Sequence, residues 1–121
     1  MADAGGGLPK SHRLLKPVEF TATLKSTRRW RDSCFGVYAL PNLYSHGRIG
    51  IVVSRKTSPR AVVRNRVKRQ IRESYRRYQK KLAGLDIVVV ANPKAGVALV
   101  DVLRTSLQEL WQKVEQQCKK S

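Results

Sequence analysis

Acidic residues are scarce in this 121-residue chain, and histidines are scarcer still. Eight Asp and Glu stand against 25 Lys and Arg, which gives a formal net charge of +17. Because no two acids lie close together in the sequence, the chain is a poor candidate for a nuclease that holds two metal ions with converging carboxylates. His12 and His46 fall in a predicted tail and a predicted loop, and no Gly-rich phosphate loop is present. We therefore expect no catalytic residue and no metal site in the protein itself.

Cysteines and long apolar runs are also few. Cys34 and Cys118 are too far apart and too few for a disulfide framework, and two lone thiols do not predict a zinc site. No apolar run follows a positive segment at the start, so we expect no signal peptide and read both thiols as reduced. No stretch approaches the roughly 20 apolar residues that span a bilayer. The sequence thus predicts a cytoplasmic protein with no membrane partner.

Positive charge is what the chain has in excess, with a sequence pI near 10.8. A compact protein with this charge repels itself, so a polyanionic partner is expected, and nucleic acid is the leading candidate. A membrane-surface peptide is the alternative, for which a large exposed apolar helix face would be needed. Since 41% of the residues are apolar, one modest core can form. We expect a flexible, Gly-rich tail over residues 1–11 and a single RNA-binding domain over residues 12–121.

The spacing of apolar residues predicts the order of helices and strands. A short helix begins at Pro17, and Val63, Val67, Ile71, Tyr75, Tyr78 and Leu82 line one face of a long helix that Gly84 ends. Residues 34–40 and 48–54 read as strands joined by a hairpin loop, residues 86–91 as a further strand, and residues 99–114 as a last amphipathic helix. The predicted fold class is α+β, an α/β sandwich in which helices cover the sheet.

The densest charge lies at the start of the long helix, in Arg64-Asn65-Arg66-Val67-Lys68-Arg69-Gln70-Ile71-Arg72. Like charges one turn apart destabilise a helix, so either apolar packing outweighs them or a bound polyanion relieves them. A helix N-terminus also presents free N–H groups and a positive dipole end to phosphate. A merely solvated face is the alternative, but such a face normally mixes signs, and only Glu73 interrupts this one.

The sequence around this basic run closely resembles the signature of the ribonuclease P protein family, in residues 53–56, 61–69 and 72–76. Residues 8–14, 48–50 and 85–91, together with the Leu107, Leu110, Trp111 helix, resemble further family segments in the same order, so the resemblance covers nearly the whole chain. It implies an αβββαβα fold with a four-stranded mixed sheet and a left-handed crossover between two parallel strands. Spacing alone would not predict that hand, because right-handed crossovers are the rule.

The resemblance also implies a function. The protein would be a subunit of an endoribonuclease that removes the single-stranded 5′ leader of precursor tRNA, with the catalytic groups in an RNA subunit. Mg²⁺ would be held mainly by that RNA and the substrate, and no obligate protein partner is expected. By resemblance, the residues that face the RNA subunit are Arg64, Asn65, Arg66, Lys68, Arg69 and Arg72. The leader cleft, between the first helix and the sheet, would involve Phe20, Leu24, Tyr38, Arg55 and Lys56.

Some positions depart from the family pattern or stay open. Leu24 stands where an aromatic is common, so only apolar contact is expected there, Leu8 takes a position that is often aromatic, and Asn92-Pro93 replaces a usual basic residue. On a strand, Tyr38 points away from Phe35, so we expect Phe35 in the core and Tyr38, like Phe20, in the cleft.

Three questions about single residues and function are left by the sequence. The sequence leaves open whether Trp30, among its neighbouring arginines, stacks on an RNA base. Asp86 and Asn65 are candidates for a water-mediated contact with a metal ion, and the alternative for Asp86 is an ion pair with a nearby arginine. A small ribosomal-type RNA-binding protein and a stand-alone nuclease remain the other function classes.

Overall fold

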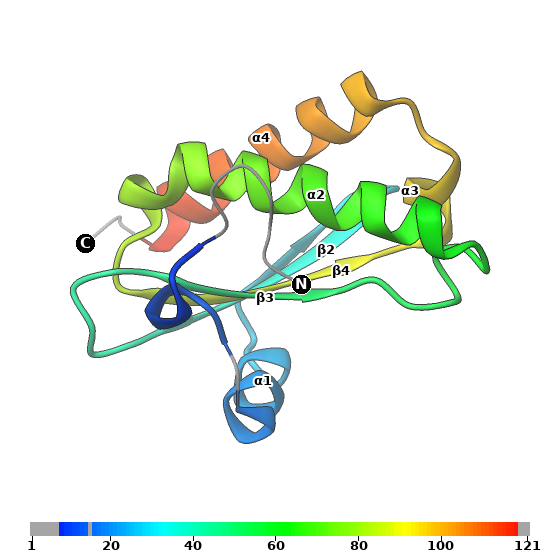
Figure 1. Cartoon of the computed structure of the whole chain (residues 1–121). Helices are drawn as coiled ribbons and strands as arrows, with labels where there is room; N and C mark the ends of the chain where they lie inside the picture. The colour runs from blue at the N-terminus through cyan, green and yellow to red at the C-terminus, as the bar shows by residue number, and fades with distance from the viewer. Residues whose placement is uncertain (1–7, 15, 119–121) are drawn as a thin grey trace.

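The computed structural model describes residues 8–14 and 16–118. Its helices and strands are, in chain order, η1 (Lys10–His12), α1 (Pro17–Leu24), β1 (Arg29–Arg31), β2 (Phe35–Pro41), β3 (Arg48–Val52), α2 (Ala61–Tyr78), η2 (Gln79–Leu82), β4 (Leu85–Ala91), α3 (Pro93–Val97) and α4 (Val100–Cys118). The four strands form one sheet, with α2 and α4 covering one face and α1 lying on the other (Figure 1). The predicted α+β sandwich is confirmed, and Pro17 begins the first helix as expected.

The strand order is β1-β2-β4-β3, so the last strand of the sequence lies inside the sheet. β4 runs antiparallel to β2 and parallel to β3. The predicted hairpin between the second and third strands is therefore wrong, because β4 separates them. The reason is burial: Ile87, Val88 and Val89 are fully buried, and only a central strand covered on both faces can hide three consecutive apolar side chains.

The connection from β3 to β4 runs through α2. In Figure 1 the chain leaves the right-hand end of β3, returns above the sheet through α2 and enters β4 behind β3. This path is a left-handed crossover between parallel neighbours, as the family resemblance implied and as the general rule for such connections did not.

The apolar face of α2 packs as the spacing predicts. Val67, Ile71 and Tyr75 are completely buried, while the predicted last turn is a separate 3₁₀ segment, η2, that carries the buried Leu82. Gly84 follows with a φ of 81°, a left-handed conformation that side chains with a Cβ rarely adopt. The helix thus reverses into β4 at the glycine that the sequence placed at its end.

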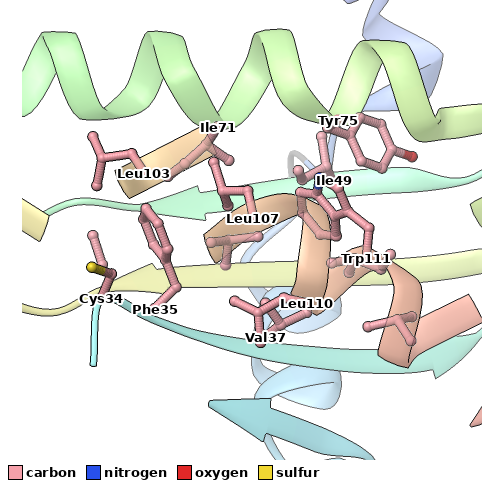
Figure 2. Packing of buried hydrophobic residues seen from close by; sticks show 14 of the residues in the cluster. Cys34, Phe35, Val37, Ile49, Ile71, Tyr75, Leu103, Leu107, Leu110 and Trp111 are labelled. Carbon is pink, nitrogen blue, oxygen red and sulfur yellow. The ribbon is translucent and has the colours of Figure 1, made fainter. Parts of the chain in front are cut away.

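α4 closes the core over the same face of the sheet. Leu107, Leu110 and Trp111 point toward Phe35 and Val37 of β2 (Figure 2). The Trp111 ring meets Tyr75 edge to face at 6.0 Å, and its Nε1 donates to the Ser74 hydroxyl at 2.8 Å. Both Phe35 and Trp111 are therefore core residues, as expected.

Trp30 also belongs to this side of the sheet. It packs against the core cluster, and its Nε1 donates to Gln117 Oε1 of α4 at 2.9 Å. Because Trp30 pairs with the core residue Val37 across β1 and β2, its side chain lies on the face opposite α1. In the folded protein the half-buried Trp30 side chain thus packs on α4.

The segment before α1 is more ordered than the predicted tail. Leu8 is 5% exposed and part of the core cluster, η1 follows it, and Leu14 N–H donates to the Ile49 carbonyl of β3 at 2.9 Å. Residues 8–11 therefore pack with the domain, and residues 1–7 of the predicted tail lie outside the described residues. Over the part of the chain that the structure describes, no helix combines the length and the apolarity needed to span a membrane.

Candidate nucleic-acid interface

The outward face of α2 carries the six residues predicted to face an RNA subunit. Asn65, Arg66 and Arg69 are exposed, whereas Arg64, Lys68 and Arg72 are half-buried. All six lie on one helix whose opposite face is locked into the core by Val67 and Ile71. The structure thus presents them together as one rigid basic surface, because residues three and four apart share a helix face.

The N-terminal end of α2 adds to this positive surface. Its first turn contains no acid, and Arg60 at the N-cap makes no side-chain capping hydrogen bond. The positive end of the helix dipole therefore meets a cluster of cations, an arrangement that a phosphate group would stabilise.

The loop before α2 is tied down by hydrogen bonds to neighbouring backbone. Thr57 Oγ1 donates to the Ala91 carbonyl at 2.9 Å, and the Ser58 carbonyl accepts from Arg64 Nη1 at 3.0 Å. Arg55 and Lys56 are exposed in this same loop. The structure thus groups these two residues with the start of α2, and they do not line the hollow on the other face of the sheet.

That hollow, of about 380 Å³, lies beside β1 on the face that carries α1. The residues that line it are Gly36, Tyr38 and Val90, together with Asn92 and the β1 residues Arg29, Trp30 and Arg31. Strand register explains the grouping: Arg29 pairs with Tyr38 and Arg31 with Gly36, and paired residues point to the same face of a sheet. An aromatic floor with guanidinium groups beside it can stack an unpaired base and hold its phosphate.

Phe20 lies on the same face but farther along the sheet. Its ring stands directly over Gly50 of β3, so closely that a Cβ at Gly50 would come within 2.3 Å of the Phe20 ring. Tyr38 and Gly50 both pair with Val88 of β4, which places Phe20 and Tyr38 two strands apart, about 10 Å. Leu24 ends α1 and is 37% exposed. Two predicted cleft residues thus come from α1 and one from the sheet, across the same surface.

Arg29 and Arg31 were given no site role by sequence reasoning. The signal was present as Arg-Trp-Arg, in which a half-buried aromatic is flanked by two exposed cations at the spacing of one strand face. A three-residue strand is too short to be recognised by alternation alone.

Asp86 pairs with an arginine, which answers the second open question. Its two carboxylate oxygens accept from Arg48 Nε at 2.9 Å and Arg48 Nη2 at 2.7 Å, and Asn42 Nδ2 adds a third donor at 2.8 Å. The hydrogen bond to Asp86 is the main cause that raises the pKa of Arg48. Three donors, two of them from Arg48, therefore hold the Asp86 carboxylate in the folded protein.

The two histidines predicted in tail and loop meet in space. Their rings lie 4.4 Å apart, and His46 Nε2 is 2.8 Å from the Ser11 carbonyl. Burial, and then the neighbouring His46, lower the pKa of His12. Within residues 8–14 and 16–118, no three His, Cys, Asp or Glu side chains are grouped as metal ligands would be.

A basic helix on one face and an aromatic hollow edged with arginines on the other define a small RNA-binding α+β protein. The family model for ribonuclease P matches residues 8–115, and the chain belongs to the ribonuclease P protein family. It is 41% identical to the ribonuclease P protein component of Methylococcus capsulatus, over 94% of this chain and 89% of that protein. For the Marinobacter nauticus protein component the identity is 40%, over 93% and 86%.

Solved structures agree with this assignment. The fold matches the ribonuclease P protein of Staphylococcus aureus with a TM-score of 0.80 and 30% identity, over 87% of this chain and 96% of that one. The Thermotoga maritima protein gives a TM-score of 0.73 at 30% identity, over 84% and 96%. The protein is thus the protein component of an endoribonuclease that acts in tRNA processing.

Two glycines on the α1 face allow a matched test of how α1 sits on the sheet. Gly50→Ala is expected to lower the free energy of unfolding by about 1–3 kcal/mol, because the added methyl group must push Phe20 away. In Gly36→Ala the Cβ would lie 3.7 Å from the Tyr38 ring, an ordinary contact, so little change is expected. Urea unfolding of both variants measures the difference; equal stabilities would show that Phe20 is not held where the structure has it.

Proposed function

We propose that this protein binds the RNA subunit of ribonuclease P through the N-terminal half of α2, and the single-stranded 5′ leader of precursor tRNA through the α1 face of the sheet. In this way it assists the endonucleolytic removal of the leader. The observation that carries the proposal is the separation of two basic surfaces. α2 covers one face of the sheet and α1 the other (Figure 1), and strand register places Tyr38, Arg29 and Arg31 on the α1 face. A protein built so can contact two RNA segments at once.

The surface for the RNA subunit comprises Arg64, Asn65, Arg66, Lys68, Arg69 and Arg72, with Arg55 and Lys56 in the adjoining loop. Support comes from the rigidity of the helix and from the lack of acids in its first turn. Charges held on a packed helix need little further ordering to meet phosphates, which favours affinity. Sequence reasoning placed Arg55 and Lys56 at the leader cleft; we propose that they belong to this surface, since the loop that holds them leads into α2.

The surface for the leader comprises Phe20, Leu24 and Tyr38, to which the structure adds Arg29 and Arg31. Stacking of an unpaired base on an aromatic face contributes about 1–3 kcal/mol, and it is tolerant of sequence because every base has such a face. Such tolerance suits a protein that must accept many different leaders. Leu24, lacking an aromatic ring, supplies apolar contact alone.

We further propose that the phosphodiester bond is cut by the RNA subunit and that Mg²⁺ is held by that RNA and the substrate. The protein would support metal binding by screening phosphate repulsion with its positive charge. The partners proposed are therefore the RNA subunit and precursor tRNA, with no membrane and no obligate protein partner, and the compartment proposed is the cytoplasm.

The function is tested by cleavage of precursor tRNA at low Mg²⁺, with protein alone, bacterial ribonuclease P RNA alone, and both together. Efficient cutting at the mature 5′ end is expected from the mixture only. Cutting by protein alone would establish a stand-alone nuclease. If the protein adds nothing to the RNA, it acts as a general RNA-binding protein of the ribosomal type.

Arg64→Ala and Arg69→Ala test the surface on α2. Each is expected to weaken binding of the RNA subunit and to reduce the slope of log K against log salt concentration by about 1, as one phosphate contact is lost. Lys113→Ala removes the same charge from an exposed position of α4 and is the control. Filter binding over a range of KCl concentrations measures both quantities. If affinity and slope stay unchanged in both arginine variants, α2 is not the RNA-binding surface.

Tyr38→Ala tests the hollow. Loss of one stacked base is expected to weaken holoenzyme binding of leader-bearing precursor tRNA by about 1–3 kcal/mol, with no effect on mature tRNA. Tyr38→Phe keeps the ring and is expected to behave like the unaltered protein. An equal loss for both RNAs would place the leader elsewhere.

A further inference from the structure

A cluster of three charges joins α1 to the sheet. Arg48, at the start of β3, makes its two hydrogen bonds to Asp86 and donates through Nη1 to Glu19 Oε2 of α1 at 3.0 Å. The side chains of Arg48 and Asp86 are 13% and 8% exposed, and that of Glu19 is 25% exposed. The cluster is thus largely shielded from water, where charge-assisted hydrogen bonds are strongest.

Arg48 is held from several sides, so it is a fixed point on the sheet. Asp86 grips it with both oxygens and is itself held by Asn42 at 2.8 Å. The Tyr44 ring lies 4.6 Å from the guanidinium carbon, in cation–π geometry. By contrast, a single hydrogen bond, from Arg48 Nη1, connects the Glu19 side chain to the sheet.

Glu19 provides a polar tether for α1. The hydroxyls of Thr21 and Thr23 donate to the Pro17 and Glu19 carbonyls, within the helix itself. Among the α1 side chains that the structure describes, Glu19 therefore makes the polar contact with the sheet. Its neighbour in the chain is Phe20, whose ring stands over Gly50, two residues from Arg48 on the same face of β3.

The presence of a second carboxylate beside Arg48 also needs an explanation. Asp86 alone neutralises Arg48, so Glu19 adds a further negative charge to the pair, in a hollow that Lys10, Arg13 and Lys16 also line. A carboxylate beside a surface that binds RNA repels phosphate, which lowers affinity unless the carboxylate has another role. The hydrogen bond from Arg48 to Glu19 indicates such a role, because it holds α1 in place on the sheet.

We propose that Glu19 is a positioning residue for the leader: through Arg48 it fixes α1 on the sheet, and so sets the place of Phe20 in the cleft. The proposal rests on the proposed binding of the leader to this face. Because Glu19 acts through α1, its loss is expected to weaken recognition of the leader although the protein becomes more positive. A purely electrostatic role predicts the opposite sign.

The test compares how tightly reconstituted holoenzyme binds precursor tRNA with a leader and the same tRNA without one; the ratio of the two affinities is the readout. Glu19→Ala is expected to lower this ratio roughly three- to tenfold, the range for loss of one intramolecular hydrogen bond. Glu109→Ala, which removes an exposed acid of α4, makes the same change in net charge and is expected to keep the ratio.

A second control separates the tether from the helix dipole, because Glu19 also lies in the first turn of α1. The double variant Val18→Glu, Glu19→Ala restores the first-turn carboxylate at a position that is 71% exposed, without restoring the contact with Arg48. Its ratio is expected to stay low. Glu19→Asp keeps the charge and the helix end but shortens the reach to Arg48, and it carries the test if Glu19→Ala does not fold; its ratio is also expected to fall.

The inference is overturned if Glu19→Ala or, where that variant does not fold, Glu19→Asp has an unchanged or higher ratio, or if the double variant recovers the ratio of the unaltered protein. Failure of the proposed function looks different. In that case the unaltered protein itself binds both RNAs equally well in the holoenzyme, and there is no ratio for any variant to change.

Discussion

Packing of one face of α2 is the constraint on which the rest of the structure depends, because the other face repels itself. Four like-charged pairs three or four residues apart lie between Arg64 and Arg72, and together they destabilise the helix by about 1–2 kcal/mol. Burial of Val67 and Ile71 contributes about 1.5–3 kcal/mol each, so packing outweighs the repulsion. The helix can therefore hold its charges in place without a bound polyanion, so the basic surface is already formed in the free protein.

β4 links the packed core under α2 to the opposite face of the sheet. As the central strand it alternates between the two sides: Ile87 and Val89 pack under α2 and α4, whereas Val88 and Val90 face α1. The floor of the cleft is therefore the reverse side of the hydrophobic core. A surface backed in this way can keep an aromatic ring in a fixed position, which a loop would not do.

Sequence reasoning predicted the elements whose signal is local and missed what depends on pairing. The apolar face of α2, the buried Trp111 and the helix that begins at Pro17 each follow from short-range spacing, and all are confirmed. The insertion of β4 between β2 and β3 does not follow from spacing, because it depends on which strand most needs cover on both faces. The place of Leu8 in the core was missed for a related reason: a single apolar residue beside a Gly-rich segment gives no periodic pattern.

The candidate site divides in the same way. The arginine run on α2 could be read from the sequence because it is continuous, and its exposure in the structure needs only helix geometry. The pairing of Arg29 with Tyr38, and of Arg48 with Glu19 and Asp86, joins residues 9, 29 and 38 positions apart, so only the folded chain shows it. On the α1 face, cations thus have two different surroundings. Arg29 and Arg31 edge an open hollow, where phosphate can reach them, while the guanidinium of Arg48 is bound by the carboxylates of Asp86 and Glu19 and its side chain is only 13% exposed. Charge alone does not separate these roles; the partners of each guanidinium do.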